Sequence, residues 1–201
     1  FVDKSEIDLM AKLYFDLYRL GQVQKNIEEV EPIVRNADLL SFDISSVRQS
    51  EAPGNKNASP NGFYGEQACQ IARYAGLSDK LTSIGFHEVN PELDSNGQTA
   101  HLVAQMMWYF IDGVSNRKKD FPIGSRKTYT KYRVNIQEGE NELVFYKSDK
   151  SERWWMDVPY PSHEKIKYER HLLVPCSYED YQVACNNEMP NRWWQTFQKL
   201  S

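Results

Sequence analysis

The sequence has little of what marks several specialised classes of protein. Only three cysteines are present, Cys69, Cys176 and Cys185, without Cys-x-x-Cys spacing, so neither a disulfide framework nor a zinc site is expected. No apolar run approaches the roughly 20 residues that span a bilayer, and no signal peptide is visible, so we expect no membrane association. Internal repeats and low-complexity segments are also absent from the sequence.

Positive charge is scarce as well. The 24 Lys and Arg are outnumbered by 28 Asp and Glu and form no basic block, so nucleic acid is not expected as a partner. A hydrophobic content of 40% in 201 residues is ordinary for one domain with a sizeable core. We expect a soluble, cytoplasmic protein. The chain begins at Phe1 instead of methionine, which is compatible with a processed product or a fragment.

Helix and strand patterns alternate through the first part of the chain. Apolar spacing and turn residues predict a helix from Ser5 to Gly21, a shorter helix over 27–34, and a strand that ends at Asp43. The elements expected next are a long polar loop over 45–61, a helix over 61–76, a strand over 81–89 and a helix over 98–115. This order is typical of an α/β fold with parallel strands and right-handed crossovers.

The two helices that flank the second strand each show an apolar side that we expect to face the core. In the first helix these residues are Ala68, Ile71, Ala72 and Ala75, and in the second they are Ala100, Val103, Ala104, Met107, Phe110 and Ile111. Cys69 lies in the first of these helices and is interpreted as a core residue instead of a nucleophile.

After residue 117 the pattern changes from helical to alternating spacing. The expected elements are a β-hairpin over 132–136 and 143–146 around a Glu-Gly-Glu-Asn turn, a third strand over 154–158, a short apolar segment over 171–174 and a Trp-rich helix capped by Asn191. We therefore predict an α/β part over 1–117 and a C-terminal extension over 118–201 packed on it. The pairs Trp154-Trp155 and Trp193-Trp194 are either a carbohydrate or peptide platform or core and interface residues, and we favour the second interpretation.

Two consecutive predicted strands each end in a carboxylate, Asp43 and Glu88. If the strands are parallel neighbours, both carboxylates lie at the carboxyl edge of the sheet, where open α/β folds bind ligands. A hard divalent ion or a cationic substrate group is what such a pair would share. The alternative is a capping Asp and an unrelated surface Glu.

The residues around these carboxylates carry a recognisable series of motifs. They are Ser-Phe-Asp-Ile-Ser (41–45), Ala-Pro-Gly (52–54), Ser-Pro-Asn-Gly-Phe (59–63), Glu-Val-Asn-Pro-Glu-Leu-Asp (88–94) and Gly-Gln-Thr-Ala (97–100). In this order they resemble the ureohydrolase superfamily of arginases, agmatinases and formimidoylglutamases, over about Asp38 to Asp112. Residues 116–201 resemble nothing in the core of that family.

The resemblance implies a three-layer α/β/α fold with a mainly parallel, arginase-like sheet and a pair of Mn²⁺ ions. In such enzymes a metal-bound hydroxide attacks a guanidinium or formimino carbon, because coordination lowers the pKa of water. Asp43 matches a carboxylate that bridges both ions, Ser45 stands at the position of a second ligand, and Glu88 matches the acid that pairs with cationic substrate nitrogens. The implied partners are a small amidine or guanidine substrate and, by analogy, further copies of the chain.

Three departures from the family pattern weaken the implied metal site. Ser45 replaces an aspartate, and a neutral hydroxyl is a far weaker Mn²⁺ ligand than a carboxylate. Ser46-Val47-Arg48 replaces an Asp-Pro type of continuation, and Arg48 either occupies the place of metal charge or is a solvated loop residue. The Asp-x-His-x-Asp motif is absent, and none of the histidines has its context; these are His87, His101, His163 and His171. We interpret His87 as packed against a helix.

Three hypotheses remain open from the sequence. The chain is a metal-dependent C–N hydrolase acting on a linear amidine or guanidine, with formimidoylglutamate as the family-typical substrate. Alternatively, it is a non-catalytic relative that serves as a binding or assembly module, or it is an α/β fragment of a larger enzyme whose other ligands lie upstream. We predict that these 201 residues by themselves are inactive, because a chain with only Asp43 from the carboxylate ligand set cannot hold two ions.

Overall fold

The computed structural model describes residues 3–122, 127–136, 141–159 and 173–200. The chain divides into two compact units. The parallel-sheet unit comprises residues 19–121, and the antiparallel-sheet unit comprises residues 3–18 together with the described residues from 122 onward. Among the helices within those ranges, none has the length and apolar character to cross a membrane.

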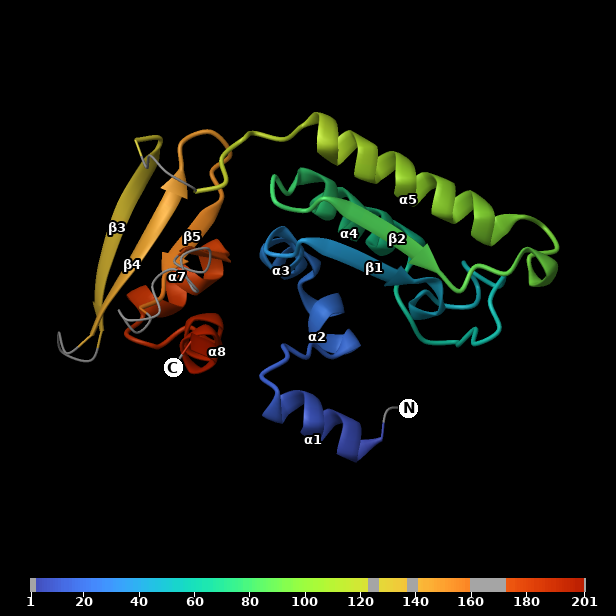
Figure 1. Ribbon diagram of the computed structural model, residues 1–201, viewed down its shortest axis with the longest axis horizontal. Helices are drawn as coiled ribbons and strands as arrows, with labels where there is room; N and C mark the ends of the chain where they lie inside the picture. Colours follow the sequence, from blue (N-terminus) through green and yellow to red (C-terminus); the bar gives the residue numbers. More distant parts are fainter. Residues whose placement is uncertain (1–2, 123–126, 137–140, 160–172, 201) are drawn as a thin grey trace. The chain divides into compact units, whose positions relative to one another are not determined.

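The parallel-sheet unit contains two strands with helices packed around them (Figure 1). In chain order its elements are α2 (Leu20–Lys25), η1 (Ile27–Glu29), α3 (Val30–Arg35), β1 (Leu39–Asp43), η2 (Ile44–Ser46), α4 (Gly65–Leu77), β2 (Ser83–His87), η3 (Pro91–Leu93) and α5 (Gln98–Ser115), where η denotes a 3₁₀ helix. β1 pairs with β2 in parallel, from Leu39 opposite Ser83 to Asp43 opposite His87. The predicted α/β alternation with parallel strands is therefore confirmed.

The two faces of this sheet have different surroundings. Phe42 and Phe86 belong to the hydrophobic core, with ring centroids 6.3 Å apart. The predicted inner side of α4 packs against them, and its four residues are all buried; they are Ala68, Ile71, Ala72 and Ala75. Successive strand residues point to opposite faces, so Asp43 and its partner His87 share the other face, and both are exposed. The interpretation of His87 as packed against a helix was therefore wrong.

The buried side of α5 differs from the predicted one. Val103 is buried as expected, but Met107 and Ile111 are 47% and 60% exposed, and the core is instead filled by Met106. The reason is a close crossing with α4. The residues that are buried on α5 are Thr99, Leu102, Val103, Met106 and Gly113. An ideal Cβ on Gly113 would lie 2.5 Å from the Arg73 carbonyl oxygen, so the absent side chain fixes how α5 is rotated.

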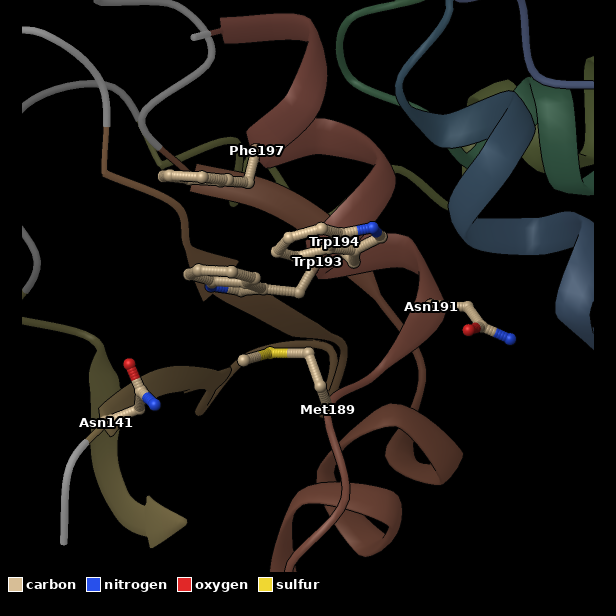
Figure 2. A pocket seen from close by; sticks show the side chains of 6 residues that line it. All are labelled: Asn141, Met189, Asn191, Trp193, Trp194 and Phe197. Atoms are coloured by element: carbon tan, nitrogen blue, oxygen red, sulfur yellow. The ribbon is translucent and has the colours of Figure 1, made fainter. Parts of the chain in front are cut away.

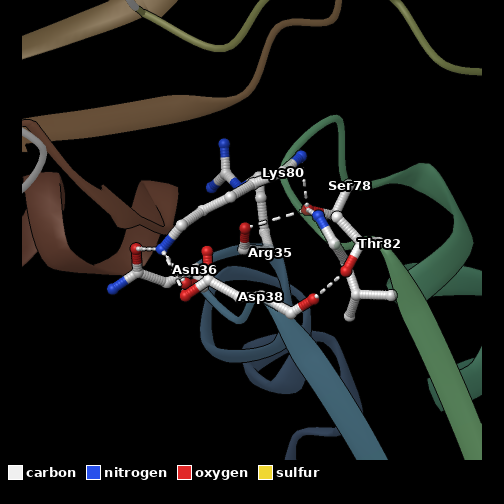
Figure 3. Close-up of polar contacts among 7 residues, drawn as sticks. Arg35, Asn36, Asp38, Ser78, Lys80 and Thr82 are labelled. Atoms are coloured by element: carbon white, nitrogen blue, oxygen red, sulfur yellow. Dashed lines mark hydrogen bonds and ion pairs between the residues drawn. The ribbon is translucent and has the colours of Figure 1, made fainter.

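Hydrogen bonds at the amino ends of the strands fix the register of the sheet (Figure 3). The amide and the hydroxyl of Thr82 both donate to the Asp38 carbonyl oxygen at 2.9 Å. The Ser78 hydroxyl donates to the Arg35 carbonyl oxygen at 2.9 Å, and the Lys80 ammonium stands 3.6 Å from the Asp38 carboxylate. These bonds join the α3–β1 turn to the α4–β2 turn. They thereby set which residues are opposite one another at the far, carboxyl edge.

The antiparallel-sheet unit has its own core. Its elements are α1 (Lys4–Lys12), β3 (Tyr129–Ile136), β4 (Asn141–Ser148), β5 (Trp154–Asp157), β6 (Leu173–Cys176), α7 (Tyr178–Cys185) and α8 (Asn191–Leu200). The strands form one sheet in the order β3-β4-β5-β6, with every neighbouring pair antiparallel. The predicted hairpin, third strand and Trp-rich final helix are confirmed. Of the predicted Glu-Gly-Glu-Asn turn, residues 138–140 lie outside the described ranges, and Asn141 is the first residue of β4.

The first helix is shorter than predicted. Asp3 caps α1 by accepting a hydrogen bond from the Ser5 amide at 2.7 Å, so Ser5 is not the cap. The helix ends at Lys12, and Tyr14 follows in a left-handed conformation with φ 58°. Gly21, which was expected just after this helix, lies within α2.

Candidate functional site

The parallel pairing of β1 and β2 brings two acidic residues to one edge of the sheet. Asp43 is the last residue of β1 and is opposite His87, the last residue of β2. Glu88 follows at once and leaves the strand in a left-handed conformation with φ 63°. For a non-glycine residue this conformation is uncommon and often occurs at functional turns. Asp43 and Glu88 are thus placed at the same carboxyl edge, where ligands bind in α/β folds.

The Asp43 carboxylate is engaged in a local turn. It accepts a hydrogen bond from the Ser45 amide at 2.8 Å and so caps the 3₁₀ helix η2. The Ser46 hydroxyl donates to the Asp43 carbonyl oxygen at 2.6 Å. Asp43 is exposed and Ser45 is partly buried. This turn therefore holds the carboxylate and the Ser45 hydroxyl within one short segment.

The long loop after β1 is held in shape by bonds between its two ends. The Phe63 amide donates to the Ser46 carbonyl oxygen at 2.8 Å, and the Arg48 amide donates to the Phe63 carbonyl oxygen at 3.1 Å. The guanidinium of Arg48 lies 3.3 Å from the centroid of the Tyr64 ring and donates to the Gly62 carbonyl oxygen at 3.4 Å. The Arg48 side chain is therefore engaged with Tyr64 and Gly62, and it closes the loop.

A second set of bonds joins this loop to the start of α5. The amide of Gly54 donates to the Thr99 hydroxyl at 2.7 Å, and the Asn90 amide donates to the Gly54 carbonyl oxygen at 2.8 Å. Asp94 accepts from the amides of Thr99 at 3.0 Å and Ala100 at 2.9 Å. These backbone hydrogen bonds to the charged form hold the pKa of the Asp94 carboxyl below its ordinary value. Asp94 thus caps α5 and fixes both loops at the sheet edge.

The capping role of Asp94 predicts an acid-sensitive stability. The folded-state pKa is lower than the unfolded-state value of 3.8, so the stabilisation is fully present above pH 3.8 and is lost as pH falls through the folded value. We expect Asp94→Asn to lower the free energy of unfolding at pH 7 and to flatten its decline below pH 3.8. Urea denaturation between pH 7 and pH 2.5 measures both effects. The matched control is Glu92→Gln, and an acid response of Asp94→Asn equal to that of the control would contradict the role.

The acidic edge does not by itself fit a pair of metal ions. Within the ranges that the structure describes, no group of three or more His, Cys, Asp or Glu side chains could hold a metal ion. Asp43 supplies one carboxylate and Ser45 one neutral hydroxyl, whereas a dinuclear site needs several protein ligands for each ion. Asp43, Ser45 and Glu88 therefore remain predicted site residues whose roles the structure does not assign.

The sequence predicted that Asp43 and Glu88 lie at the carboxyl edge of the sheet, but it did not predict which residues hold the loops at that edge together. Gly54, Asp94 and Thr99 fall within the motifs that carried the family resemblance, yet no role was predicted for them. Their hydrogen bonds link positions up to 45 residues apart. A signal was present in Asp94 itself, because a carboxylate close to the amino end of a helix is favoured by the helix dipole, although the N-cap position of α5 is held by Gly97.

Curated relatives named formimidoylglutamase match nearly half of the chain. It is 30% identical over 95 residues to formimidoylglutamase of Staphylococcus haemolyticus, covering 46% of this chain and 30% of the relative. It is 26% identical over 102 residues to formimidoylglutamase of Bacillus subtilis, covering 49% of this chain and 32% of the relative. The chain therefore spans about a third of the length of these relatives.

Solved structures and a family model agree on the fold. Formimidoylglutamase of Bacillus subtilis superposes with a TM-score of 0.53 at 21% identity, covering 58% of this chain and 39% of that chain. Formiminoglutamase of Trypanosoma cruzi, solved with Mn²⁺, gives 0.52 at 19% identity and covers 57% and 40%. These likenesses confirm the arginase-like α/β fold class. Residues 2–112, more than half of the chain, match the model of the arginase family. Together with the motifs at the carboxyl edge, this match shows that the chain belongs to the arginase family.

Proposed function

We propose that the parallel-sheet unit carries part of an amidine or guanidine C–N hydrolase site, with N-formimidoyl-L-glutamate as the substrate. The observation that supports this most directly is the parallel pairing of β1 and β2, which brings Asp43 and Glu88 to one edge. In this proposal Glu88 accepts charge-assisted hydrogen bonds from the cationic nitrogens of the substrate. The relatives named formimidoylglutamase support this substrate over arginine.

Manganese is the metal proposed for this site, because a related formiminoglutamase was solved with it. Asp43 and Ser45 are the proposed ligands within this chain. When bound, such an ion would supply a hydroxide nucleophile at neutral pH. One carboxylate and one hydroxyl are too few for two ions, so two ions would need ligands beyond Asp43 and Ser45.

A second candidate is a non-catalytic relative that acts as a binding or assembly module. It is supported by the Asp43 carboxylate, which already caps η2, and by the resemblance, which implies that Ser45 stands where the family has a ligand aspartate. Self-association is proposed for either candidate by family analogy alone, and a cytoplasmic location is proposed from the sequence pattern.

The binding of Mn²⁺ distinguishes the two candidates, and a hydrolysis assay tests the predicted inactivity. We expect the 201-residue chain to bind at most one Mn²⁺ and to release no formamide, ammonia or urea from amidine or guanidine substrates. Asp43→Asn should abolish the Mn²⁺ binding that remains, whereas Ser45→Asp should raise the affinity about tenfold or more by adding a charged ligand. Isothermal titration calorimetry with MnCl₂ and a product assay measure these quantities.

The control for the metal experiment is Asp8→Asn, since Asp8 is an exposed acid on α1. Measurable Mn²⁺-stimulated hydrolysis by the unmodified chain would refute the predicted inactivity. Equal Mn²⁺ binding by the parent chain and Asp43→Asn would remove Asp43 from the site. If Ser45→Asp binds no more Mn²⁺ than the parent, the non-catalytic candidate is favoured.

A further inference from the structure

The helix α5 has two apolar sides, and only one of them faces the core. Its buried side packs on α4, where Gly76 and Gly113 meet (Figure 1). The second apolar side is exposed, and its residues follow one another in steps of four and three. We call them the α5 seam, and they are Ala100, Ala104, Met107, Ile111 and Val114. Such steps define the a and d positions of a heptad, through which two helices pair.

Trp108 lies beside the α5 seam and is the most exposed of the large apolar residues that the structure describes. Its exposed fraction is 71%. The tryptophans of α8 have different surroundings, because the rings of Trp193 and Trp194 each stack on Phe197 (Figure 2). Contiguous exposed apolar surface usually marks a site of interaction with another molecule. Trp108 and the α5 seam form such a surface along one helix.

The exposed side of α5 is also poor in charge. The helix contains one aspartate, Asp112, and no glutamate, lysine or arginine. The Asp112 carboxylate accepts a hydrogen bond from the Arg73 Nε at 2.9 Å. A helix side in contact with water usually carries charged residues, whereas the centre of a protein interface is poor in charge and rich in Trp, Tyr and Met. A lipid surface fits less well, because helices that lie on membranes carry Lys or Arg on the polar side.

A second copy of the chain is the protein partner that matches this surface. A heptad seam pairs with another helix of the same spacing, and every copy carries one. The charges at the two ends of α5 favour one orientation. Glu92 lies in η3 before the helix, Lys118 follows three residues after its end, and both are exposed. An antiparallel pair brings Lys118 of each copy to Glu92 of the other, whereas a parallel pair brings like charges together.

We propose that two copies of the chain associate by antiparallel pairing of their α5 helices. In such a pair an a position faces a d position of the other copy, so Ala100 faces Ile111 and Ala104 faces Met107. Each small side chain then meets a large one, which lets the two seams interdigitate. The same register places Glu92 nearly opposite Lys118. This inference does not depend on the hydrolase proposal, and it assigns a surface to the self-association that family analogy suggests.

Sedimentation equilibrium of the whole chain tests the pairing. We expect a reversible monomer–dimer equilibrium with a dissociation constant of about 10–100 μM, because a single helix seam buries less than the roughly 1,200 Å² of stable complexes. Trp108→Glu and Ile111→Lys should each weaken the dimer about tenfold or more, since each places a charge in the seam or beside it. Lys118→Glu should weaken it about threefold, and the added Glu92→Lys should restore it.

The control variant is Phe15→Glu, which introduces the same charge at a 63% exposed aromatic residue outside α5. It should leave the dimer unchanged. The far-UV circular dichroism of every variant should match that of the parent, because the substituted side chains are exposed. A parent chain that stays monomeric up to about 500 μM overturns the proposal. Association that Trp108→Glu and Ile111→Lys leave unchanged, or that Phe15→Glu weakens equally, also overturns it.

Disulfide trapping tests the orientation. The background variant is Cys185→Ser, which removes the exposed native thiol. A mixture of Ala100→Cys and Ile111→Cys chains should form a mixed disulfide dimer under mild oxidation. Neither variant should cross-link alone, because 11 helical residues, or about 16 Å, separate like positions in the antiparallel pair, and a disulfide joins Cα atoms less than about 7 Å apart. Efficient cross-linking of each variant to itself would show a parallel pair and overturn the proposal.

Discussion

Gly76→Ala is expected to destabilise the parallel-sheet unit by about 3 kcal/mol, the upper end of the usual cost of overpacking. Gly76 is buried on α4 where this helix crosses α5. An ideal Cβ there would overlap the Phe110 carbonyl oxygen and stand 3.0 Å from the Gly113 Cα. Both neighbours are backbone atoms of a helix, so they cannot move aside as a side chain would. The helices must separate, and the core between them and the sheet loosens.

The chain offers a matched control for this substitution. Gly21 is also within a helix of the same unit, but nothing lies within 4 Å of an ideal Cβ there. Gly21→Ala should therefore raise stability by about 0.5–1 kcal/mol, because alanine has the better helix propensity. Urea denaturation followed by far-UV circular dichroism measures both variants. We expect Gly76→Ala and Gly21→Ala to change the free energy of unfolding in opposite directions.

A double substitution makes the test more specific. Gly113→Ala should cost a similar amount, since its Cβ would lie 2.5 Å from the Arg73 carbonyl oxygen and 2.9 Å from the Gly76 Cα. Once one alanine has separated the helices, the second meets less resistance, so the pair should cost less than the sum of the two. A neutral effect of Gly76→Ala would mean that the helices do not cross at this point.

The order of elements in the parallel-sheet unit could be predicted because each helix and strand has its own local spacing of apolar residues. The spacing of Ala68, Ile71, Ala72 and Ala75 has the helical period, and all four are buried. The setting of α5 could not be predicted in the same way. Its apolar residues extend around much of the helix, so periodicity does not choose a side. The contact between Gly76 and Gly113 decides which side of α5 is buried, and no local sequence pattern predicts that contact.

The same distinction applies to the candidate site. The positions of Asp43 and Glu88 followed from strand ends, and the observed pairing of β1 with β2 places them at one edge. By contrast, the hydrogen bonds that Asp94 accepts from the Thr99 and Ala100 amides were not foreseen, because the sequence does not show which amides a carboxylate before a helix will meet. His87 was misplaced because its strand was assumed to have a helix on each face, whereas the face it shares with Asp43 is exposed.

In the antiparallel-sheet unit, the sequence predicted the strands but left the tryptophans open between core and binding roles. Trp154 and Trp155 are 8% and 1% exposed, which confirms the core interpretation for this pair. Trp194, at 49% exposed, does not share that environment. Alternation along β5 and periodicity along α8 are similar signals for apolar packing. Only the assembled fold shows which of these rings has no covering element among the described residues.

Phe145→Ala is expected to give the largest loss of stability in that unit, about 4 kcal/mol. Phe145 is fully buried in β4, and its ring meets that of Tyr181 on α7 edge to face, with centroids 5.5 Å apart. It is opposite Met156 on the neighbouring strand, which is also fully buried. Removing the ring leaves an apolar cavity and removes one of the aromatic contacts that hold Tyr181 of α7 on the sheet; Tyr132 and Trp154 make the others. Fluorescence of the adjacent Trp154 and Trp155 during urea denaturation reports the change.

Two further phenylalanine variants show whether the loss comes from this cavity. Phe145→Leu keeps most of the buried volume and should cost less than about 1.5 kcal/mol, whereas Phe15→Ala should change stability by less than about 0.5 kcal/mol because Phe15 is 63% exposed. The expected order of losses is therefore alanine at 145, leucine at 145 and alanine at 15. Equal losses of stability for alanine at 145 and at 15 would mean that β4 and α7 do not enclose the Phe145 ring.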